Sequence, residues 1–276
     1  MKKILLATTL IAATTGYAAA EIAVSGSARM GVIDDGTATG AQFTSRVRIV
    51  FTATGETDGG LAFGASVRND QSGQGNTANG DSTVFISGAF GKLTMGDTGN
   101  ASDSIVGQVS GVGLTGLGDL NEIGFLNKDV TGAMYEYSAG ALTFGLGLGQ
   151  ANATEDFISA AVKFSTDAYS VALGYEDNNT QGTQLSLLGS ATVSGATIKA
   201  KIVDGDLTPD MQYALSVDYA ISGATVTAFY ADKDTNGTAY GLGASYDLGG
   251  GASVVGGIAR AEGGDTAFDL GVSMKF

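Results

Sequence analysis

Hydrophobic and polar residues alternate one by one over long stretches of the chain. The segment Gln42–Phe51 reads QFTSRVRIVF, and its apolar residues share one parity: Phe43, Val47, Ile49 and Phe51. Arg46 and Arg48 have the other parity. Successive side chains of a β-strand point to opposite faces, so this alternation predicts a strand with one apolar and one polar face.

The same alternation recurs in sixteen segments. They are residues 21–33, 42–54, 61–70, 82–90, 92–97, 131–138, 141–149, 157–165, 168–176, 183–192, 196–203, 211–221, 224–231, 238–247, 252–260 and 266–276. Short connections alternate with longer polar ones, and one connection, Thr98–Val130, is much longer than the rest. The pattern predicts an all-β chain of sixteen antiparallel strands with a single long insertion.

Three features indicate that the apolar face meets lipid. The strands are about 9–11 residues long, which crosses a bilayer at a steep tilt, whereas soluble strands average about 5–6 residues. Alternating short and long connections are typical of turns on one side of a membrane and loops on the other. Tyrosines fall in pairs near strand ends, as two aromatic girdles require: Tyr169 and Tyr175, Tyr213 and Tyr219, Tyr240 and Tyr246. A soluble sandwich with scattered surface tyrosines is the alternative.

Closure of the sheet follows from the lipid surroundings. An open sheet edge inside a bilayer would leave backbone groups unpaired, at a cost of several kcal/mol each. An even number of strands allows the first and last strands to pair antiparallel. The predicted fold is therefore a transmembrane antiparallel β-barrel over residues 21–276, with both ends on the side of the short turns.

The first twenty residues are predicted to be a secretory signal peptide. Lys2 and Lys3 give a positive start, Ile4–Ala13 is apolar, and Ala18–Ala20 offers an A-x-A cleavage site. The apolar run is shorter than the roughly 18–20 residues of a spanning helix, so a short anchor helix is the weaker alternative. The mature chain would begin at Glu21.

Composition narrows the chemistry that the chain can perform. The sequence contains no Cys, His or Trp, which excludes His-based triads, thiol nucleophiles and zinc sites with N or S ligands. Without Lys2 and Lys3, the 14 basic residues fall to 12 against 28 acidic ones, a formal charge of −16. This acidity argues against nucleic-acid binding, and an enzyme is a remote alternative.

The chain resembles general outer-membrane porins of Gram-negative bacteria, in particular those of alphaproteobacteria. The segment GAFGKLTMGDTGN (Gly88–Asn100) is similar to the hairpin that leads into the third loop of that family. The segment AFDLGVSMKF (267–276) is similar to the family's last strand, which ends in Phe. The insertion Thr98–Val130 occupies the place of the third loop.

The resemblance implies a function and a setting. It implies an outer-membrane homotrimer, in contact with lipid and lipopolysaccharide, that passes ions and small hydrophilic solutes by passive diffusion. It also implies that the third loop folds into the barrel and forms a constriction. The sequence departs from the family in two places: it lacks the Pro-Glu-Phe-Gly-Gly loop tip of enteric porins, and it has Asp97 where a basic residue often follows the hairpin.

Parity assigns a set of basic residues to the inner face. Arg29, Arg46, Arg48 and Arg68 come from three consecutive strands, and closure would place Arg260 and Lys275, from the last two strands, beside them. We expect these six residues to form a basic wall of the pore. Arginines that fill a closed lumen are the alternative, although sixteen strands leave a wide interior.

The insertion and its ends carry the opposite charge. The acidic residues are Asp97, Asp103, Asp119, Glu122 and Asp129, the last beside Lys128. If the insertion folds inward, these carboxylates face the basic wall, and the transverse field favours hydrophilic solutes. An external solvated lid is the alternative, and the apolar stretch Val109–Leu117 could rest on the inner wall or touch a neighbouring subunit.

Three further alternatives remain open at the level of the sequence. Acidic outer loops at 34–36, 176–178, 204–206 and 232–234 could bind structural calcium or could simply be solvated. The overall charge suggests a mild cation preference, which the basic wall opposes. A substrate-specific channel and a structural or adhesive surface barrel are the competing functions, and the shortness of most loops disfavours the adhesive one.

Overall fold

The computed structural model describes residues 20–37, 39–72, 76–126, 131–150 and 156–276, with side chains except at 76–81 and 131. The predicted signal peptide lies outside the described residues, apart from Ala20. Neither of the two short helices among the described residues is long or apolar enough to cross a membrane.

Sixteen strands make up the described chain. They are β1 (Glu21–Asp34), β2 (Gln42–Glu56), β3 (Ala62–Ser72), β4 (Asn76–Gly88), β5 (Gly91–Asp97), β6 (Thr131–Ala139), β7 (Leu142–Leu148), β8 (Phe157–Ser165), β9 (Tyr169–Asn178), β10 (Gly182–Val193), β11 (Ala196–Gly205), β12 (Gln212–Ile221), β13 (Ala224–Asp232), β14 (Thr238–Gly249), β15 (Ala252–Ala261) and β16 (Thr266–Lys275). Each pairs antiparallel with its neighbours, and β1 pairs with β16. The predicted closed barrel is confirmed.

The alternation along each strand separates an apolar outer face from an inner one. On β9 and β10, Leu173 lies opposite Leu187, and both side chains are exposed on the outer face. The next pair, Ala172 and Leu188, is buried on the inner face. An apolar side chain left exposed on the outside of a closed barrel is what a lipid environment requires.

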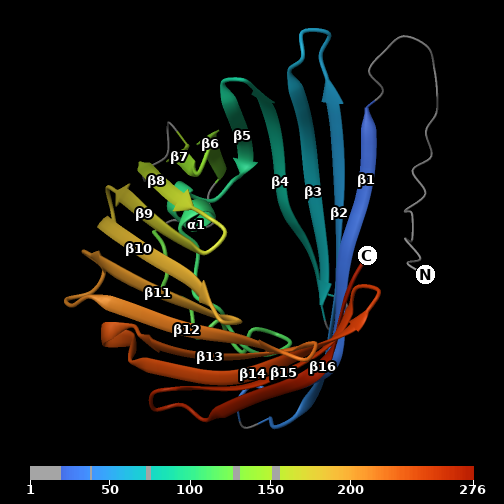
Figure 1. The fold of residues 1–276 in the computed structure, drawn as a ribbon, viewed down its shortest axis with the longest axis vertical. Coiled ribbons are helices and arrows are strands. Elements are labelled where there is room, and N and C mark those ends of the chain that lie inside the picture. The colour runs from blue at the N-terminus through green and yellow to red at the C-terminus, as the bar shows by residue number, and fades with distance from the viewer. Residues whose placement is uncertain (1–19, 38, 73–75, 127–130, 151–155) are drawn as a thin grey trace.

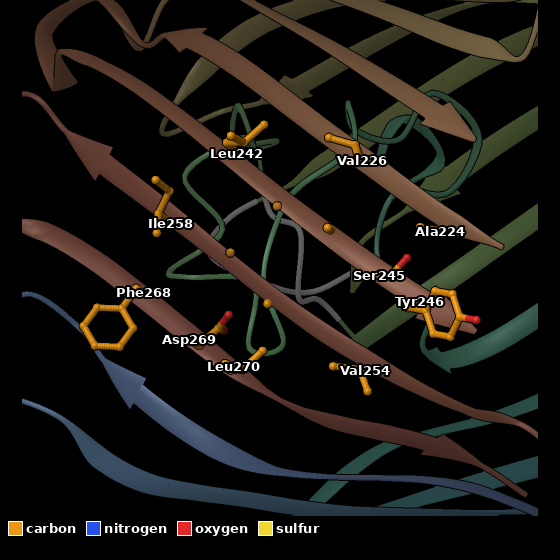
Figure 2. A pocket seen from close by; sticks show the side chains of 14 residues that line it. Ala224, Val226, Leu242, Ser245, Tyr246, Val254, Ile258, Phe268, Asp269 and Leu270 are labelled. Carbon is orange, nitrogen blue, oxygen red and sulfur yellow. The ribbon is translucent and has the colours of Figure 1, made fainter. Parts of the chain in front are cut away.

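The outer face over β13–β16 also carries a shallow apolar groove (Figure 2). Large side chains surround it: Val226, Leu242, Tyr246, Val254, Ile258, Phe268 and Leu270. The small residues Ala244 and Gly256 lie between them. Figure 2 also shows the green inserted segment behind these strands, on the inner side of the sheet.

The insertion between β5 and β6, called the inserted loop below, lies inside the barrel over its described part, residues 98–126. Helix α1 (Ala101–Ile105) contacts β7, β8 and β9, and the segment after it runs along the inner side of the strands toward β16 (Figure 1). Ala101 N donates a hydrogen bond to Ser159 Oγ of β8 at 2.8 Å, and Ser110 N donates one to Ser216 Oγ of β12 at 2.9 Å. The external-lid alternative therefore fails for residues 98–126.

Apolar contacts hold the inserted loop to the inner wall. Three buried clusters join loop residues to strand residues: Ile105, Val106 and Phe125 with Met134, Ala161, Ala172 and Leu188; Val109 and Ile123 with Val203, Ala214 and Ala231; and Val112 and Leu117 with Phe229, Ala239, Ala259 and Ala267. The stretch Val109–Leu117 thus rests on the inner wall, one of the two places expected for it. Burial of these side chains is the main stabilising contribution to the loop position.

Glycines on the inner face make room for this close approach. A Cβ at Gly257 of β15 would lie 2.7 Å from the backbone nitrogen of Gly113 in the loop. A Cβ at Gly243 of β14 would lie 2.9 Å from Val112 Cβ. Both separations are too short for a carbon contact, so the backbone of the loop can lie this close only against glycine.

Candidate pore constriction

Four of the predicted basic residues, called the arginine wall below, lie together on the inner face of β1–β3. Arg29 of β1 is directly opposite Arg46 of β2, and Arg48 follows on the same face two residues later. Arg68 of β3 lies opposite Val50, again on the inner face of β2. The antiparallel register of three neighbouring strands therefore brings together side chains that are up to 39 residues apart in sequence.

An acidic residue that the sequence analysis missed lies within this group. Asp70 is opposite Arg48 and accepts hydrogen bonds from Arg48 Nε at 2.8 Å and Arg48 Nη2 at 2.7 Å. Arg68 Nε lies 3.3 Å from Asp70 Oδ1. Asp70 stands two residues after Arg68, so parity alone would have placed it on the inner face. It balances part of the positive charge of the wall.

Arg46 differs from its neighbours. Among the described residues it has no hydrogen-bond or ion-pair partner, and its Nε is buried without an acceptor. Its electrostatic partners are Arg48 and Arg68, which repel it, and Asp70, which attracts it. Asp70 is already bound to Arg48, so Arg46 carries a largely uncompensated charge.

Arg29 and Asp269 hold the tip of the inserted loop. Asp269 of β16 is 3% exposed and accepts hydrogen bonds from Leu114 N at 2.8 Å and Thr115 N at 2.6 Å. Thr115 Oγ1 donates a third, at 2.7 Å. From β1, Arg29 Nη1 donates to Leu114 O at 3.2 Å. Asp269 was not among the predicted site residues, although its parity, between Phe268 and Leu270, points inward.

Two of the predicted acidic residues follow the tip. Asp119 is exposed, interacts electrostatically with Arg29, and has φ of 53°. Glu122 follows on a turn in which its backbone nitrogen donates to Asp119 O at 2.9 Å. Asp119 is therefore within electrostatic range of Arg29.

Lys233 is a second residue that the sequence analysis missed. It belongs to the connection between β13 and β14, next to the short helix η1 (Asp234–Asn236). Burial lowers the pKa of Lys233, and the carboxylates of Glu122 and Asp119 partly offset this lowering. An outer connection thus places a cation near the two loop carboxylates. Alternation along a strand does not predict where a side chain in a connection points, so the position of Lys233 is seen only in the structure.

Three other predicted residues lie elsewhere. Asp97, at the end of β5, accepts a hydrogen bond from Ser82 N of β4 at 3.1 Å. Asp103 lies in α1, half-buried, where its backbone nitrogen donates to Asn100 Oδ1. Lys275 has the inner parity of Arg29 but lies opposite Ser27, at the end of the barrel with the short turns. Asp129 and Lys128 fall outside the described residues.

The expected position of Arg260 in the basic wall is wrong. Arg260 lies opposite Tyr240, whose ring is exposed on the outer face, and its Nε donates to Gly264 O at 3.0 Å. Its neighbour Ala259 is the inward residue and is buried under the inserted loop. Alternation misleads here because the loop covers the inner face of β15, which is therefore small and apolar rather than polar.

A buried polar group behind the loop supports it from the wall. Lys201 of β11 has no exposed surface and donates to Gln108 Oε1 at 2.8 Å and Ile123 O at 3.1 Å. Its ammonium also lies 3.6 Å from the centre of the Phe125 ring. Glu176 of β9, equally buried, accepts a hydrogen bond from Leu126 N at 3.2 Å. These side chains satisfy loop backbone groups that would otherwise lack partners.

Calcium at the acidic connections receives no support from geometry. Within the described part of the chain, no group of three or more acidic side chains could hold a metal ion. Asp206 instead accepts hydrogen bonds from Thr183 N at 2.7 Å and Thr183 Oγ1 at 2.9 Å, which lower its pKa. Calcium there stays a prediction, which calorimetric titration with calcium would test.

Comparison with known proteins points to one family. The family model described as Gram-negative porin matches residues 7–266. The porin of Rhodobacter capsulatus is 37% identical over 306 aligned positions, which cover 93% of this chain and 100% of that protein.

Solved structures agree. A porin structure refined at 1.8 Å resolution has a TM-score of 0.79 and 36% sequence identity, covering 93% of this chain and 100% of its own. A mutant of Rh. blastica porin has a TM-score of 0.81 at 22% identity, covering 92% of this chain and 100% of its own. The second similarity, at that level of identity, concerns the fold.

Proposed function

We infer, since this chain belongs to the family of Gram-negative porins, that the arginine wall and the inserted loop form the constriction of its channel. The protein is a general diffusion porin of the outer membrane, through which ions and small hydrophilic solutes pass without energy input. The observation that carries the inference is the position of the inserted loop, inside a closed barrel and clamped at its tip to β1 and β16.

The constriction has two charged sides. Arg46, Arg48 and Arg68, on β2 and β3, form the basic side. Asp119 and Glu122, which come after the tip of the inserted loop, form the acidic side. Charges of opposite sign across a water path orient water and polar solutes, while an apolar solute would have to displace the oriented water. This arrangement filters by size and favours hydrophilic solutes.

Conductance measurements test this proposal. Purified protein added to a planar lipid bilayer in KCl should give discrete steps of current. A salt gradient across the same bilayer gives the reversal potential, and with it the ion selectivity. A protein that inserts without steps of current would refute the channel, and one blocked by micromolar sugar would favour the substrate-specific alternative.

We also propose that the protein forms a homotrimer. Every tyrosine after residue 20 lies on β6, β9, β12, β13 or β14, and β15, β16 and β1–β5 carry none. Tyrosine is favoured where an apolar surface meets the lipid headgroups. A tyrosine-free sector that still carries exposed apolar side chains, such as Phe43 and Phe51, is suited to contact with another subunit. Cross-linking of the unheated protein in detergent should give a trimer.

Lipopolysaccharide is the proposed neighbour of the outer connections, and co-purification followed by mass spectrometry tests it. We propose that the chain catalyses no reaction, because the family consists of porins and the sequence has no His or Cys. Release of fatty acid or peptide from model substrates by the purified protein would contradict this.

A further inference from the structure

We propose that Arg46 is a binding position for small oxyanions, with phosphate as the representative ligand, inside the channel. The inference rests on the proposed function and adds a ligand class to it. The four arginines of the wall have different roles, and Arg46 is the one whose charge the protein leaves available.

Arg46 lies among like charges. Arg29 and Arg46 are directly opposite each other in the antiparallel register of β1 and β2. Like charges in this position repel, and a guanidinium cannot relieve the repulsion by losing a proton. Arg48 and Arg68 add to the repulsion on Arg46. An anion bound beside Arg46 would offset it.

The other three arginines already have partners within the protein. Arg48 gives two of its nitrogens to Asp70, and Arg68 approaches the same carboxylate. Arg29 gives Nη1 to the loop carbonyl of Leu114. Among the described residues Arg46 has no such partner, and its Nε, like those of Arg29 and Arg68, is buried without an acceptor in the chain. Arg46 is therefore the one arginine of the four with no partner on any of its nitrogens among the described residues, which leaves its guanidinium available to an acceptor from outside the chain.

The surroundings of Arg46 suit an oxyanion. Ser72 of β3 lies opposite Arg46, and Thr44 precedes it by two residues on the same inner face, so two hydroxyls accompany the guanidinium. A planar guanidinium binds two oxygens of a phosphate or carboxylate at once, which chloride cannot reproduce. The position therefore distinguishes oxyanions from simple halides, and its positive charge repels cations.

Binding at this position must be weak for the channel to conduct. A solute that enters must also leave, and the water path around Arg46 screens its charge. We therefore expect millimolar affinity, seen as a brief interruption of current rather than a permanent block. Solutes that carry a phosphate would be concentrated in the lumen relative to neutral solutes of the same size.

Single-channel recording with inorganic phosphate tests the proposal. In KCl at pH 8, added phosphate should interrupt the current of the unmodified protein in a concentration-dependent way, at fixed ionic strength. Arg46→Ser should weaken this block about tenfold, the loss of one bidentate charge-assisted contact. Arg46→Gln serves if the serine variant inserts poorly.

Arg68→Ser is the matched control. It removes the same charge from the same wall, but from an arginine that is bound to Asp70, so the block should change by less than about twofold. If the Arg46 and Arg68 variants lost the phosphate block equally, the block would be due to the overall positive charge of the wall, and the proposal would be overturned. Undiminished block in the Arg46 variants would overturn it as well. Absence of current steps in plain KCl would instead refute the channel itself.

Discussion

Arg48 and Asp70 face each other across β2 and β3, with two of the arginine's nitrogens bound to the carboxylate at 2.7 and 2.8 Å. The wall of four arginines is therefore partly neutralised before any solute or loop carboxylate arrives. The balance of charge along this part of the channel wall therefore depends on Asp70.

Asp70→Asn should make the channel more selective for anions. The change keeps the shape of the side chain and removes its charge, so Arg48 and Arg68 both face the lumen uncompensated. The permeability ratio of chloride to potassium should rise by about twofold to fivefold, the range for a partly exposed ion pair. Reversal potentials in a KCl gradient measure it. Asp58→Asn, in an exposed turn, removes an equal charge far from the arginine wall and should leave the ratio unchanged.

The double change of Arg46 and Arg48 to serine should have the opposite effect. Removing two guanidiniums from the inner face leaves Asp70 paired only with Arg68 and widens the water path. Conductance should increase and selectivity should shift toward cations, while the barrel still folds. Arg260→Ser, on the outer face, should change neither quantity. An unaltered reversal potential in the double variant would show that these arginines do not line the narrow part.

Asp269→Asn should loosen the tip of the inserted loop. The carboxylate accepts three hydrogen bonds from Leu114 and Thr115, and hydrogen bonds to a charged group contribute about 1.5–3 kcal/mol. The amide group of asparagine turns a donor toward these donors. We expect noisier open-channel current and closure at lower voltage. Asp247→Asn, near the end of β14, provides the baseline, and current as quiet as that baseline would argue against the clamp.

Gly257→Ala should narrow the channel. The new methyl group would meet Gly113 N at 2.7 Å, so the loop backbone must move away from β15 and into the lumen. Single-channel conductance should fall while the folded barrel persists on unheated gels. Gly189→Ala on β10 is the matched control, because a Cβ there meets nothing within 4 Å. Equal conductance in the two variants would mean that the loop accommodates the methyl group without moving.

Much of the fold could be predicted from the sequence because a barrel in lipid imposes one rule on every strand. Alternation located all sixteen strands, and the greatest disagreement is at β4, which begins at Asn76 rather than at 82. Residues 76–81 carry no large apolar residue on either parity, as expected for a strand that extends beyond the lipid. The start of β4 could therefore not be predicted from the alternation of hydrophobic and polar residues.

The site was harder to predict because its key contacts join distant segments. Parity placed Arg46 and Arg48 on the inner face, and would have placed Asp70 and Asp269 there too had it been applied to acids. It could not show that Arg29 binds the carbonyl of Leu114, 85 residues away. It misplaced Arg260 because the inserted loop makes the inner face beneath it apolar, which removes the contrast that alternation depends on.

The clamp at the loop tip also links the constriction to the order of assembly. Leu114 and Thr115 find their partners on β1 and β16, the first and last strands of the sheet, which meet only when the barrel closes. A partly assembled chain that lacks β16 has no carboxylate for the tip to bind. The tip of the inserted loop can therefore be clamped only in the same event that closes the barrel.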